Sequence, residues 1–318
     1  MLDQYNRKID YLRISVTDRC NLHCAYCQPQ QAAFVPHAEI LRYEEILHIC
    51  QLAVQLGISK FKITGGEPLL RRDCCDFIIS LKRMEGVEQV TLTTNGTLLP
   101  QFVAQLVTAE VDCVNVSLDT LDTDAYMQLT GGSLQNVLQG LDALAGSGLR
   151  FKLNCVPLAD MGAGQILALL KLAHGYGAPL RFIELMPLAC NNTLTGLSGR
   201  EIRSQLQQAG LVLQRDGARY GNGPAAYWRV AGYRMPVGFI EPIHNKFCSS
   251  CNRVRLTSVG LLQPCLYSDS GLSLKRMLRD GLADADILAA MRETIGAKPL
   301  GHQFDTSPAR FSMNQIGG

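Results

Sequence analysis

The sequence contains no apolar run long enough to cross a membrane and no long run of like charge. A membrane-spanning helix needs about 20 mostly apolar residues, and a polyanion-binding arm or membrane-surface patch needs clustered charge. The formal net charge is only +2, so we expect no binding to nucleic acid or membrane. The polar residues 1–10 do not form a signal peptide or an anchor. These absences favour a cytoplasmic location.

Cysteine is a residue that the sequence has in quantity, with 12 in 318 residues. In a reducing cytosol, cysteines are more often metal ligands, catalytic groups or buried small side chains than disulfides. The composition is otherwise globular, with 47% apolar and 18% charged residues, enough for two domains or one large barrel with an appendage. Six cysteines form two clusters. We interpret the other six as core or surface thiols: Cys50, Cys74, Cys75, Cys113, Cys155 and Cys190.

Short β-rich runs alternate with longer helical patterns over the first 185 residues. Six runs are predicted as strands: 11–17, 60–64, 90–94, 112–118, 151–156 and 180–185. Between them, residues 43–57 and 133–148 have the apolar spacing of helices. Six βα units in succession predict an α/β fold with a parallel sheet and outer helices. Because a closed barrel has eight units, we expect a partial TIM-type barrel. The alternative is a doubly wound open sheet.

The alternation stops near residue 198, where a helical stretch leads into short strand-like pieces, YWRVAGYRM and VGFIEPI. We place a domain boundary near residue 230. The prediction is a barrel domain over residues 1–230 and a C-terminal region over residues 231–318, which carries the second cysteine cluster and ends in Gly-Gly.

The first cysteine cluster, CNLHCAYC, places Cys20, Cys24 and Cys27 at a Cys-x3-Cys-x2-Cys spacing. It directly follows the first predicted strand and has polar neighbours, so a buried core stripe is a poor explanation. Loops at the carboxyl ends of barrel strands are where such folds build their sites. A structural zinc site needs four ligands. A 4Fe–4S cluster on three thiolates instead keeps one iron open for another ligand, and this favours the cluster.

Two motifs together resemble the radical S-adenosylmethionine superfamily. One is the cysteine spacing with Tyr26 before the third cysteine, and the other is GGEP, residues 65–68, at the end of the second predicted strand. The resemblance implies that the open iron chelates the amino and carboxylate groups of S-adenosylmethionine. It also implies that the glycine main chain approaches the amino group of this cofactor, which a residue without Cβ allows.

The second cluster consists of Cys248, Cys251 and Cys265. Residues 257–260, Thr-Ser-Val-Gly, lie between two apolar runs and predict a hairpin turn. Folding back at this turn brings Cys265 roughly opposite Cys251. Three thiols then converge without a local fourth ligand, as in the first cluster.

Two arginines follow the first two cysteines of the second cluster. Arg253 and Arg255 alternate on a predicted strand and therefore face the same side. Two adjacent guanidinium groups repel each other unless an anion lies between them, and arginine suits phosphate. A phosphorylated ligand therefore explains the pair better than a solvated strand edge. The alternative for this cluster is a zinc ribbon whose fourth ligand is His244 or Cys190.

From LRISVTDRC (12–20) to the C-terminal Gly-Gly, the chain resembles GTP 3′,8-cyclases, the molybdenum cofactor biosynthesis protein A family. The resemblance implies two 4Fe–4S clusters and S-adenosylmethionine. In the implied reaction, a 5′-deoxyadenosyl radical takes the 3′ hydrogen of GTP, and the ribose radical attacks C8 of guanine. The product, (8S)-3′,8-cyclo-7,8-dihydroguanosine triphosphate, passes to cyclic pyranopterin monophosphate synthase. A flavodoxin-type electron donor is expected by analogy. The sequence does not decide between a monomer and a homodimer.

The resemblance also implies roles for individual residues. The cluster ligands are Cys20, Cys24 and Cys27 for the first cluster and Cys248, Cys251 and Cys265 for the second. The S-adenosylmethionine contacts are Tyr26, Gly66, Ser117 and Met186. The GTP contacts are Arg13, Lys62, Thr93, Lys152, Arg253, Val254 and Arg255. The tail that enters the active site and assists catalysis is Gly317 and Gly318.

At Lys62 the family usually has arginine, so this chain keeps the charge and loses the bidentate fork. The alternative function is that of a radical S-adenosylmethionine enzyme that modifies peptides, because many such enzymes also carry auxiliary clusters. They usually have more than three cysteines there, and they need neither the Arg-x-Arg pair nor the Gly-Gly tail. A zinc-stabilised binding module needs neither GGEP nor an open set of three thiols.

Overall fold

The computed structural model describes residues 1–27, 34–188, 193–268, 271–304 and 312–317. Its strands are β1 (Tyr11–Ser15), β2 (Lys60–Thr64), β3 (Gln89–Thr94), β4 (Cys113–Ser117), β5 (Phe151–Cys155), β6 (Leu180–Ile183), β7 (Leu213–Asp216), β8 (Ala226–Val230), β9 (Val237–Ile240), β10 (Arg253–Leu256), β11 (Leu261–Gln263) and β12 (Leu272–Ser273). Its α-helices are α1 (Tyr43–Gln55), α2 (Cys74–Lys82), α3 (Leu99–Thr108), α4 (Thr123–Thr130), α5 (Leu134–Ser147), α6 (Ala163–Gly175), α7 (Gly199–Gln208), α8 (Leu274–Arg279), α9 (Asp284–Gly296) and α10 (Met313–Ile316). Short 3-10 helices are His37–Glu39, Pro68–Leu70 and Cys248–Ser250.

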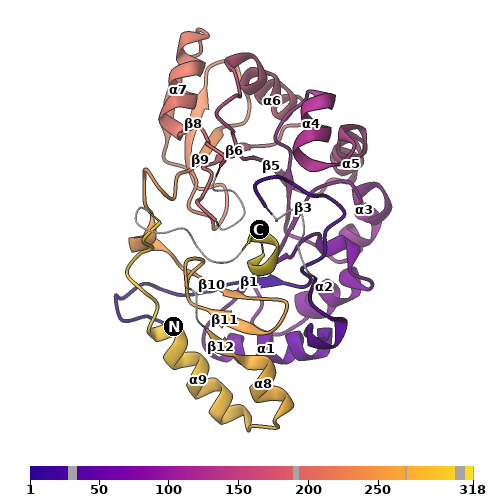
Figure 1. The fold of residues 1–318 in the computed structure, drawn as a ribbon, viewed down its shortest axis with the longest axis vertical. Coiled ribbons are helices and arrows are strands. Elements are labelled where there is room, and N and C mark those ends of the chain that lie inside the picture. Colours follow the sequence, from indigo (N-terminus) through magenta and orange to yellow (C-terminus); the bar gives the residue numbers. More distant parts are fainter. Residues whose placement is uncertain (28–33, 189–192, 269–270, 305–311, 318) are drawn as a thin grey trace.

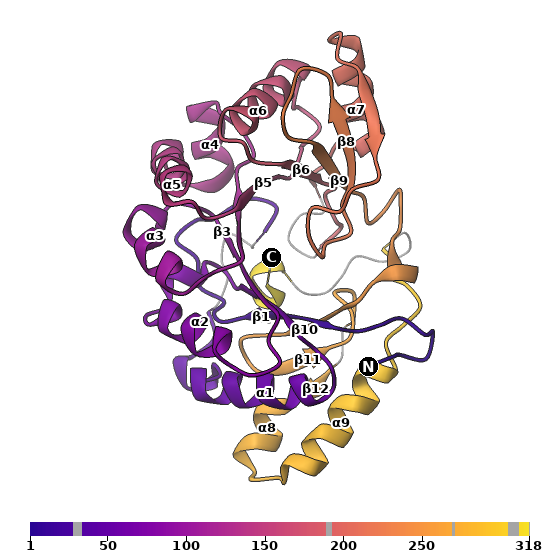
Figure 2. The same cartoon turned by 180° about the vertical axis from the view of Figure 1, so that it is seen from behind.

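The described strands form one sheet in the order β12-β11-β10-β1-β2-β3-β4-β5-β6-β9-β8-β7. The strands from β10 to β9 in this order run parallel, and antiparallel strands extend both edges. Strands β1 to β6 are neighbours in chain order, so successive crossovers move in the same direction and place their helices on one face. Figures 1 and 2 show helices α1 to α6 along that one side. A doubly wound sheet reverses direction at a switch point, so that alternative is wrong.

The predicted strands lie where the sequence indicates, with small differences at their ends. Strand β2 has the predicted bounds, whereas β1 ends two residues early at Ser15 and β6 ends two residues early at Ile183. The region after residue 230 adds two parallel strands that the six-unit prediction did not include, because β9 pairs with β6 and β10 pairs with β1. The predicted hairpin is confirmed: β10 and β11 are antiparallel, with Arg255 opposite Gln263.

Alternation along the parallel strands separates the hydrophobic core from a polar interior. Leu12 and Ile14 are fully buried in the core, and Arg13 between them points to the other face. On β2, Phe61 and Ile63 are likewise buried in the core, with Lys62 between them. The interior of a closed TIM barrel is normally filled with branched apolar side chains. Charged side chains in these positions indicate an interior reserved for a polar ligand.

The helices cover the apolar face of the sheet. Helix α1 shows how, because Ile46, Ile49, Cys50 and Ala53 recur at helical spacing and are all fully buried. Helices α8 and α9 lie at one end of the molecule and α7 at the other, while α10 lies on the side of the sheet away from α1 to α6 (Figure 1). The five described cysteines outside the two clusters are all buried, and Cys190 lies outside the described residues.

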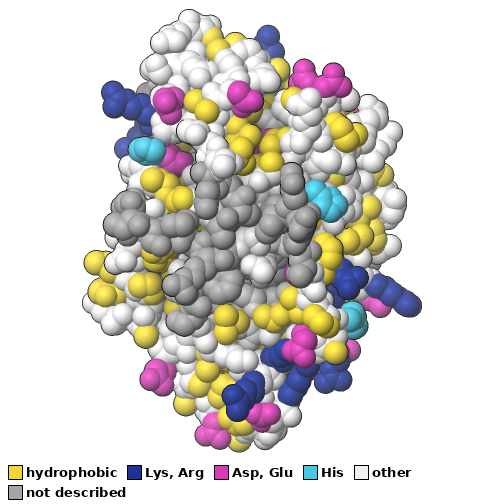
Figure 3. Space-filling model, viewed as in Figure 1, with side chains coloured by type: hydrophobic (Ala, Val, Ile, Leu, Met, Phe, Trp, Pro, Cys, Tyr) yellow, Lys and Arg dark blue, Asp and Glu magenta, His cyan; other side chains and the backbone are white. Residues whose placement is uncertain are grey.

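On the face shown in Figure 3, Lys and Arg side chains lie in small groups with Asp and Glu side chains among them. No helix within the described ranges has both the length and the apolar character needed to span a membrane.

Candidate active site

A cavity opens at the carboxyl ends of the parallel strands, and we call it the carboxyl-end mouth. Residues of β1 to β6 and β10 line this one cavity, so the sheet curves around it. Its lining includes all three cysteines of the first cluster, Cys20, Cys24 and Cys27. It also includes most of the other predicted site residues: Arg13, Tyr26, Gly66, Thr93, Ser117, Met186 and Arg255.

The first-cluster loop is held by main-chain hydrogen bonds to distant segments. His23 N donates to Thr130 O at 2.7 Å and Ala25 N to Leu129 O at 2.9 Å, which attach the loop to the end of α4. Cys27 O accepts a bond of 3.0 Å from the main chain of Met313, at the start of α10. The loop is therefore fixed on one side by the barrel and on the other by the C-terminal segment.

The GGEP turn packs directly against the start of the cysteine loop. Gly66 N donates to Thr17 O at 2.7 Å and Glu67 N to Arg19 O at 2.8 Å. A Cβ on Gly65 would lie 2.5 Å from Thr17 O, and one on Gly66 would overlap the carbonyl of Arg19. The sequence resemblance ascribed this glycine to close approach by a cofactor. In the structure, contact of Gly65 and Gly66 with the start of the cysteine loop already excludes a side chain at either position.

Glu67 is a buried carboxylate that sequence reasoning did not select. Its side chain is fully buried and accepts hydrogen bonds from the Thr94 hydroxyl and the Asn95 main chain, each at 2.8 Å. Burial raises the pKa of Glu67 to about 7, and these hydrogen bonds partly oppose the shift. Glu67 thus connects the GGEP turn to the loop after β3. Its position within the GGEP motif could have identified Glu67 from the sequence.

Asp119 is a second buried carboxylate that was missed. It follows β4 in the motif VSLD and accepts hydrogen bonds from the Tyr26 hydroxyl at 2.6 Å and from Val156 N at 2.8 Å. Burial raises its pKa to about 6. Asp119 therefore fixes the ring of Tyr26 inside the mouth, beside Ser117.

A row of cations crosses the interior of the sheet. Arg13 is paired in register with Lys62 on one side and with Arg255 on the other. The pKa of Arg13 is lowered to about 10, mainly by burial and to a smaller extent by the nearby Arg253 and Arg181. Burial, followed by Arg13 and Arg181, also lowers the pKa of Lys62 well below its ordinary range. Like charges held together away from water favour the binding of an anion.

Three buried polar atoms in this interior have no hydrogen-bond partner among the described residues: Thr93 Oγ1, Asn154 Oδ1 and Arg181 Nε. A buried polar atom without a partner costs about 1–3 kcal/mol, so a ligand that bonds to them removes this cost. Asn154 and Arg181 were not predicted. The alternation that places Lys152 inward on β5 also places Asn154 inward, and Arg181 is its register partner on β6.

Two further predicted site residues, Val254 and Gly317, lie in different surroundings. The Val254 side chain is fully buried in the hydrophobic core, which leaves only its main chain for a ligand contact. Gly317 lies against β1 and β2, where a Cβ would be 2.7 Å from Thr64, and its φ of +80° also favours glycine. Arg255 donates to Gly317 O at 2.6 Å. Gly318 lies outside the described residues.

A second cavity opens at the opposite, amino ends of the strands, and we call it the amino-end mouth. Cys251 of the second cluster lines it, close to Arg253, whose guanidinium lies 3.8 Å from the thiol. Lys152 and Arg181 line it from the first half of β5 and β6. The structure therefore divides the predicted GTP residues between the two ends of one interior.

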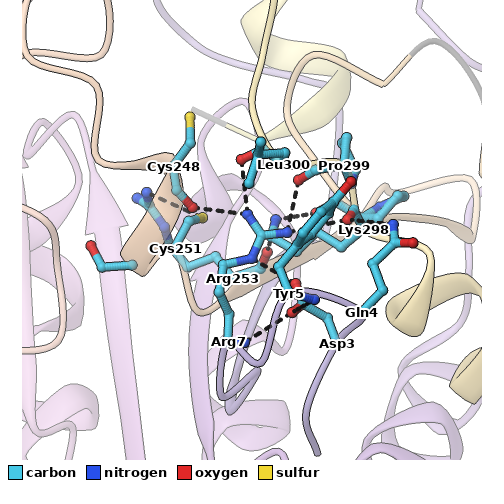
Figure 4. A network of polar contacts seen from close by, with 12 residues as sticks. Asp3, Gln4, Tyr5, Arg7, Cys248, Cys251, Arg253, Lys298, Pro299 and Leu300 are labelled. Carbon is cyan, nitrogen blue, oxygen red and sulfur yellow. Dashed lines mark hydrogen bonds and ion pairs between the residues drawn. The ribbon is translucent and has the colours of Figure 1, made fainter.

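The backbone around the second cluster is held by Arg7, a residue that sequence reasoning missed. Its guanidinium donates to Cys248 O at 2.8 Å and to Pro299 O at 2.7 Å, and it pairs with Asp3 at 2.6 Å. Figure 4 shows the guanidinium between the Cys248 segment and the segment from Lys298 to Leu300. Both side chains of the Arg7–Asp3 pair are at most 5% exposed, so this contact is shielded from solvent.

Lys298 joins the two separate parts of the second cluster. Its side chain is buried and donates to Arg253 O at 2.8 Å and to Pro264 O, the carbonyl before Cys265. Burial alone would raise the pKa of Cys251, but the charges of Arg253 and Lys298 lower it to about 7. Cations beside these thiols suit a set of thiolate ligands.

The donor chemistry of both mouths fits iron–sulfur clusters. Each of the two cysteine clusters consists of three cysteines of intermediate exposure, and soft thiolates are the ligands that iron–sulfur clusters require. Within the described chain, no three His, Cys, Asp or Glu side chains converge as ligands of one metal ion. His244, the zinc-ribbon alternative, pairs instead with Glu184, and Cys190 is outside the described residues.

Comparison with known proteins identifies two family models along the chain. Residues 14–173 match the radical SAM superfamily, and residues 178–304 match the family described as Molybdenum Cofactor Synthesis C. Among solved structures, Streptococcus suis SuiB bound to precursor peptide SuiA has a TM-score of 0.64 at 16% identity, over 96% of this chain and 75% of that one. This likeness concerns the fold alone.

Curated relatives match over the full length of the chain. The chain is 41% identical to a GTP 3′,8-cyclase of Thermodesulfovibrio yellowstonii over 100% of both chains. It is 40% identical to one of Rhodopseudomonas palustris, over 96% of this chain and 90% of that one. Identity at this level over the whole length establishes the relationship. The chain belongs to the GTP 3′,8-cyclase family, a group of radical SAM enzymes of molybdenum cofactor synthesis.

Proposed function

We propose that this chain converts GTP to (8S)-3′,8-cyclo-7,8-dihydroguanosine triphosphate, with S-adenosylmethionine and two 4Fe–4S clusters. The observation that carries the proposal is one cationic interior, with the three cysteines of the first cluster lining one mouth and Cys251 of the second cluster lining the other. A phosphorylated substrate that lies between two clusters would use the cations of the interior and both cysteine clusters. The architecture that we propose is a partial barrel in residues 1–230, with the second cluster in residues 231–318.

The first cluster is proposed to lie on Cys20, Cys24 and Cys27 and the second on Cys248, Cys251 and Cys265. S-adenosylmethionine would then contact the part of the carboxyl-end mouth formed by Tyr26, Gly66, Ser117 and Met186. The hydrogen bond from Tyr26 to Asp119 keeps this wall rigid before any ligand arrives. Preorganised groups of this kind lower the cost of ordering a bound cofactor.

When bound, the first cluster with S-adenosylmethionine supplies a 5′-deoxyadenosyl radical that removes the 3′ hydrogen of GTP. The protein's own task is to hold the ribose and the triphosphate still. Arg13, Lys62 and Arg255 stand in one row, and Lys152 and Arg181 stand nearer the amino ends. These five cations neutralise the triphosphate and keep the nucleotide oriented along the interior.

The C-terminal tail is proposed to assist catalysis from inside the carboxyl-end mouth. The carbonyls of Ile316 and Gly317 accept hydrogen bonds from Arg255 at 3.1 and 2.6 Å. These bonds turn the guanidinium of Arg255 toward the tail and fix its direction. We propose that Gly318, the next residue in the sequence, assists catalysis together with Gly317.

The partners follow from the proposed chemistry. The cyclised triphosphate is the substrate of a second enzyme, cyclic pyranopterin monophosphate synthase, and the first cluster needs one electron from a donor such as flavodoxin. A reducing cytoplasm is the compartment that keeps cluster thiolates available. Whether the chain acts as a monomer or a homodimer is open to a sedimentation measurement.

The test is an anaerobic assay of reconstituted protein with GTP, S-adenosylmethionine and dithionite, read by mass spectrometry. We expect 5′-deoxyadenosine and a cyclised isomer of GTP to appear together, and both to vanish in Cys20→Ala. Cleavage of S-adenosylmethionine with GTP left intact would refute the substrate, and it would direct attention to the peptide-modifying alternative.

A further inference from the structure

The loop that joins β7 to β8, residues 217–225, lies at the amino-end mouth and forms part of its lining. It is attached to the barrel by side chains of two strands. Lys152 donates its ammonium proton to Tyr220 O, and Asn222 donates its side-chain amide to Gln89 Oε1. Lys152 is one of the cations expected to bind GTP, so this loop touches the substrate machinery directly.

The sequence of the loop, GARYGNGPA, lets its main chain approach the cations of the barrel. Gly221 has a φ of +136°, and a Cβ there would lie 2.6 Å from Lys152 Nζ. A Cβ on Gly223 would be 4.0 Å from Arg181 Nη1. Only glycine takes the first of these conformations without strain. The loop is thus shaped to cover Lys152 and Arg181 with main chain rather than with side chains.

The charge of the amino-end mouth exceeds what the described protein groups neutralise. Six cations line it: Lys8, Lys60, Lys152, Arg181, Arg219 and Arg253. Asp10 is the carboxylate in this lining, and it is already bonded to Lys60 at 2.8 Å and to Asn252 at 2.7 Å. Such a surplus of positive charge in a concave site attracts polyanions.

Arg219 is the cation that the loop itself brings to this mouth. Its side chain is exposed, and within the described ranges it forms no hydrogen bond or ion pair with the protein. The next charged side chain on the β7 side, Asp216, is bonded to Tyr220 and Arg229 instead. The Arg219 guanidinium is therefore available to a ligand, and its planar fork suits phosphate oxygens.

We propose that residues 217–225 close the amino-end mouth over the triphosphate of the nucleotide, with Arg219 as a further substrate-binding residue that contacts its outer phosphates. This inference rests on the proposed function, because it takes the nucleotide in the interior as given. It adds a feature that selects the bound nucleotide by the number of its phosphates. The loop distinguishes a nucleoside triphosphate from the monophosphate, while the row through Arg13 and Lys62 holds either one.

The test compares Arg219→Ala with Arg215→Ala. Arg215 is an exposed arginine on β7 of the same hairpin and is not part of the mouth. Binding of GTP and GMP to the reconstituted enzyme is measured by anaerobic equilibrium dialysis. We expect Arg219→Ala to raise the Kd of GTP about tenfold and to leave the Kd of GMP unchanged. Arg215→Ala should change neither, and Arg219→Lys should restore part of the GTP affinity.

Three results would overturn the inference. Unchanged GTP binding in Arg219→Ala is one, an equal loss of GTP and GMP binding is another, and an equal effect of Arg215→Ala is the third. In each case wild-type turnover of GTP would leave the proposed function intact. A wild-type enzyme that neither binds nor converts GTP would instead refute the proposed function itself. Gly221→Ala, checked for its melting temperature, should repeat the selective loss because its φ of +136° forces the loop to move.

Discussion

The two cysteine clusters lie toward opposite mouths of the interior, but they are assembled in different ways. At the carboxyl-end mouth, the three cysteines come from one loop of eight residues, and buried carboxylates, Glu67 and Asp119, fix the surrounding turns. The second cluster, of which Cys251 lines the amino-end mouth, comes from two segments separated by a hairpin. The cations Arg7 and Lys298 hold those segments in place. One site is local in sequence, whereas the other exists only in the folded chain.

The difference in charge suits two different ligands. The carboxyl-end mouth has two carboxylates, Asp119 and Glu184, and two arginines, Arg13 and Arg255, in its lining. This balance of charge suits a zwitterionic amino acid moiety. The amino-end mouth has six cations against one carboxylate, which suits a triphosphate. Between them, the row of Arg255, Arg13 and Lys62 crosses the interior. We therefore propose that the cofactor is cleaved at one end of the interior and that the nucleotide is retained at the other.

Removing one cysteine from each mouth should separate these tasks most strongly. Cys20→Ala should abolish both 5′-deoxyadenosine and cyclised GTP, because the first cluster is needed for every later step. Cys251→Ala should abolish the cyclised product and still release some 5′-deoxyadenosine. Each variant should hold about four irons in place of about eight. Iron analysis and mass spectrometry measure both effects. If Cys251→Ala also stops cofactor cleavage completely, the tasks are not divided in this way.

Removing the side-chain contacts of Arg7 should lower both the free energy of unfolding and the occupancy of the second cluster. Arg7→Ala leaves Asp3 buried without its partner and frees the carbonyls of Cys248 and Pro299. Breaking a buried ion pair costs about 3–5 kcal/mol, and we expect this loss in the free energy of unfolding. Denaturant unfolding and iron content measure the two effects.

The matched control for Arg7 is Arg72→Ala, whose side chain is 93% exposed and pairs weakly with Asp73 at 3.5 Å. It should change the free energy of unfolding by less than about 0.5 kcal/mol. Electron paramagnetic resonance of Arg7→Ala should show selective loss of the second cluster. Equal loss of both clusters would mean that Arg7 supports the whole fold and not this mouth.

The same contrast explains what the sequence could predict. Strands β1 to β6 were evident from alternation, and the first cluster could be predicted because its three cysteines and the GGEP turn lie within short motifs. Arg7, Lys298 and Arg181 carried no such signal. Arg7 and Lys298 act through main-chain carbonyls about 240 and 45 residues away, and backbone acceptors are the same at every position. Their role follows from the tertiary structure and from no local pattern.

Strands β9 and β10 show the same limit at the level of the fold. Their pairing with β6 and β1 closes more of the curve around the interior than six units do. Each strand is only four residues long, and the intervening segment has no helical crossover between them. Periodicity therefore gave no reason to assign them to the parallel sheet.

Changing Lys62 in the interior row of cations should have a smaller, pH-dependent effect on KM for GTP. Lys62→Ala removes a cation from beside Arg13, and a charge-assisted hydrogen bond is worth about 1.5–3 kcal/mol, so KM for GTP should rise about 10-fold to 100-fold. Burial lowers the pKa of Lys62 and of Lys152, so the free enzyme loses these charges as pH rises through those values. GTP affinity should therefore fall with increasing pH at less alkaline pH than for an ordinary lysine.

Lys62→Arg tests the cause of that pH dependence. The ordinary pKa of arginine is higher than that of lysine, so this variant should keep its charge to higher pH, keep its affinity for GTP and lose part of the alkaline decline. Measurements of KM against pH for the wild type and both variants decide the matter. An identical decline in all three would show that Lys62 carries no charge that matters for binding.

The smallest expected effect concerns the buried acid of the carboxyl-end mouth. The pKa of Glu67 is about 7 in the folded protein, against an ordinary value of 4.5. A carboxyl group whose pKa is raised by folding binds its proton more tightly in the folded state, so its stabilising contribution is present at low pH and is lost as pH rises through about 7. Wild-type protein should lose about 1 kcal/mol of unfolding free energy between pH 6 and 7 from this group.

Glu67→Gln cannot ionise and should have a flatter profile over that interval, measured by denaturant unfolding under anaerobic conditions. An unchanged slope would place the pKa of Glu67 near its ordinary value, and the carboxyl-end mouth would then carry a buried negative charge that its partners Thr94 and Asn95 fully stabilise.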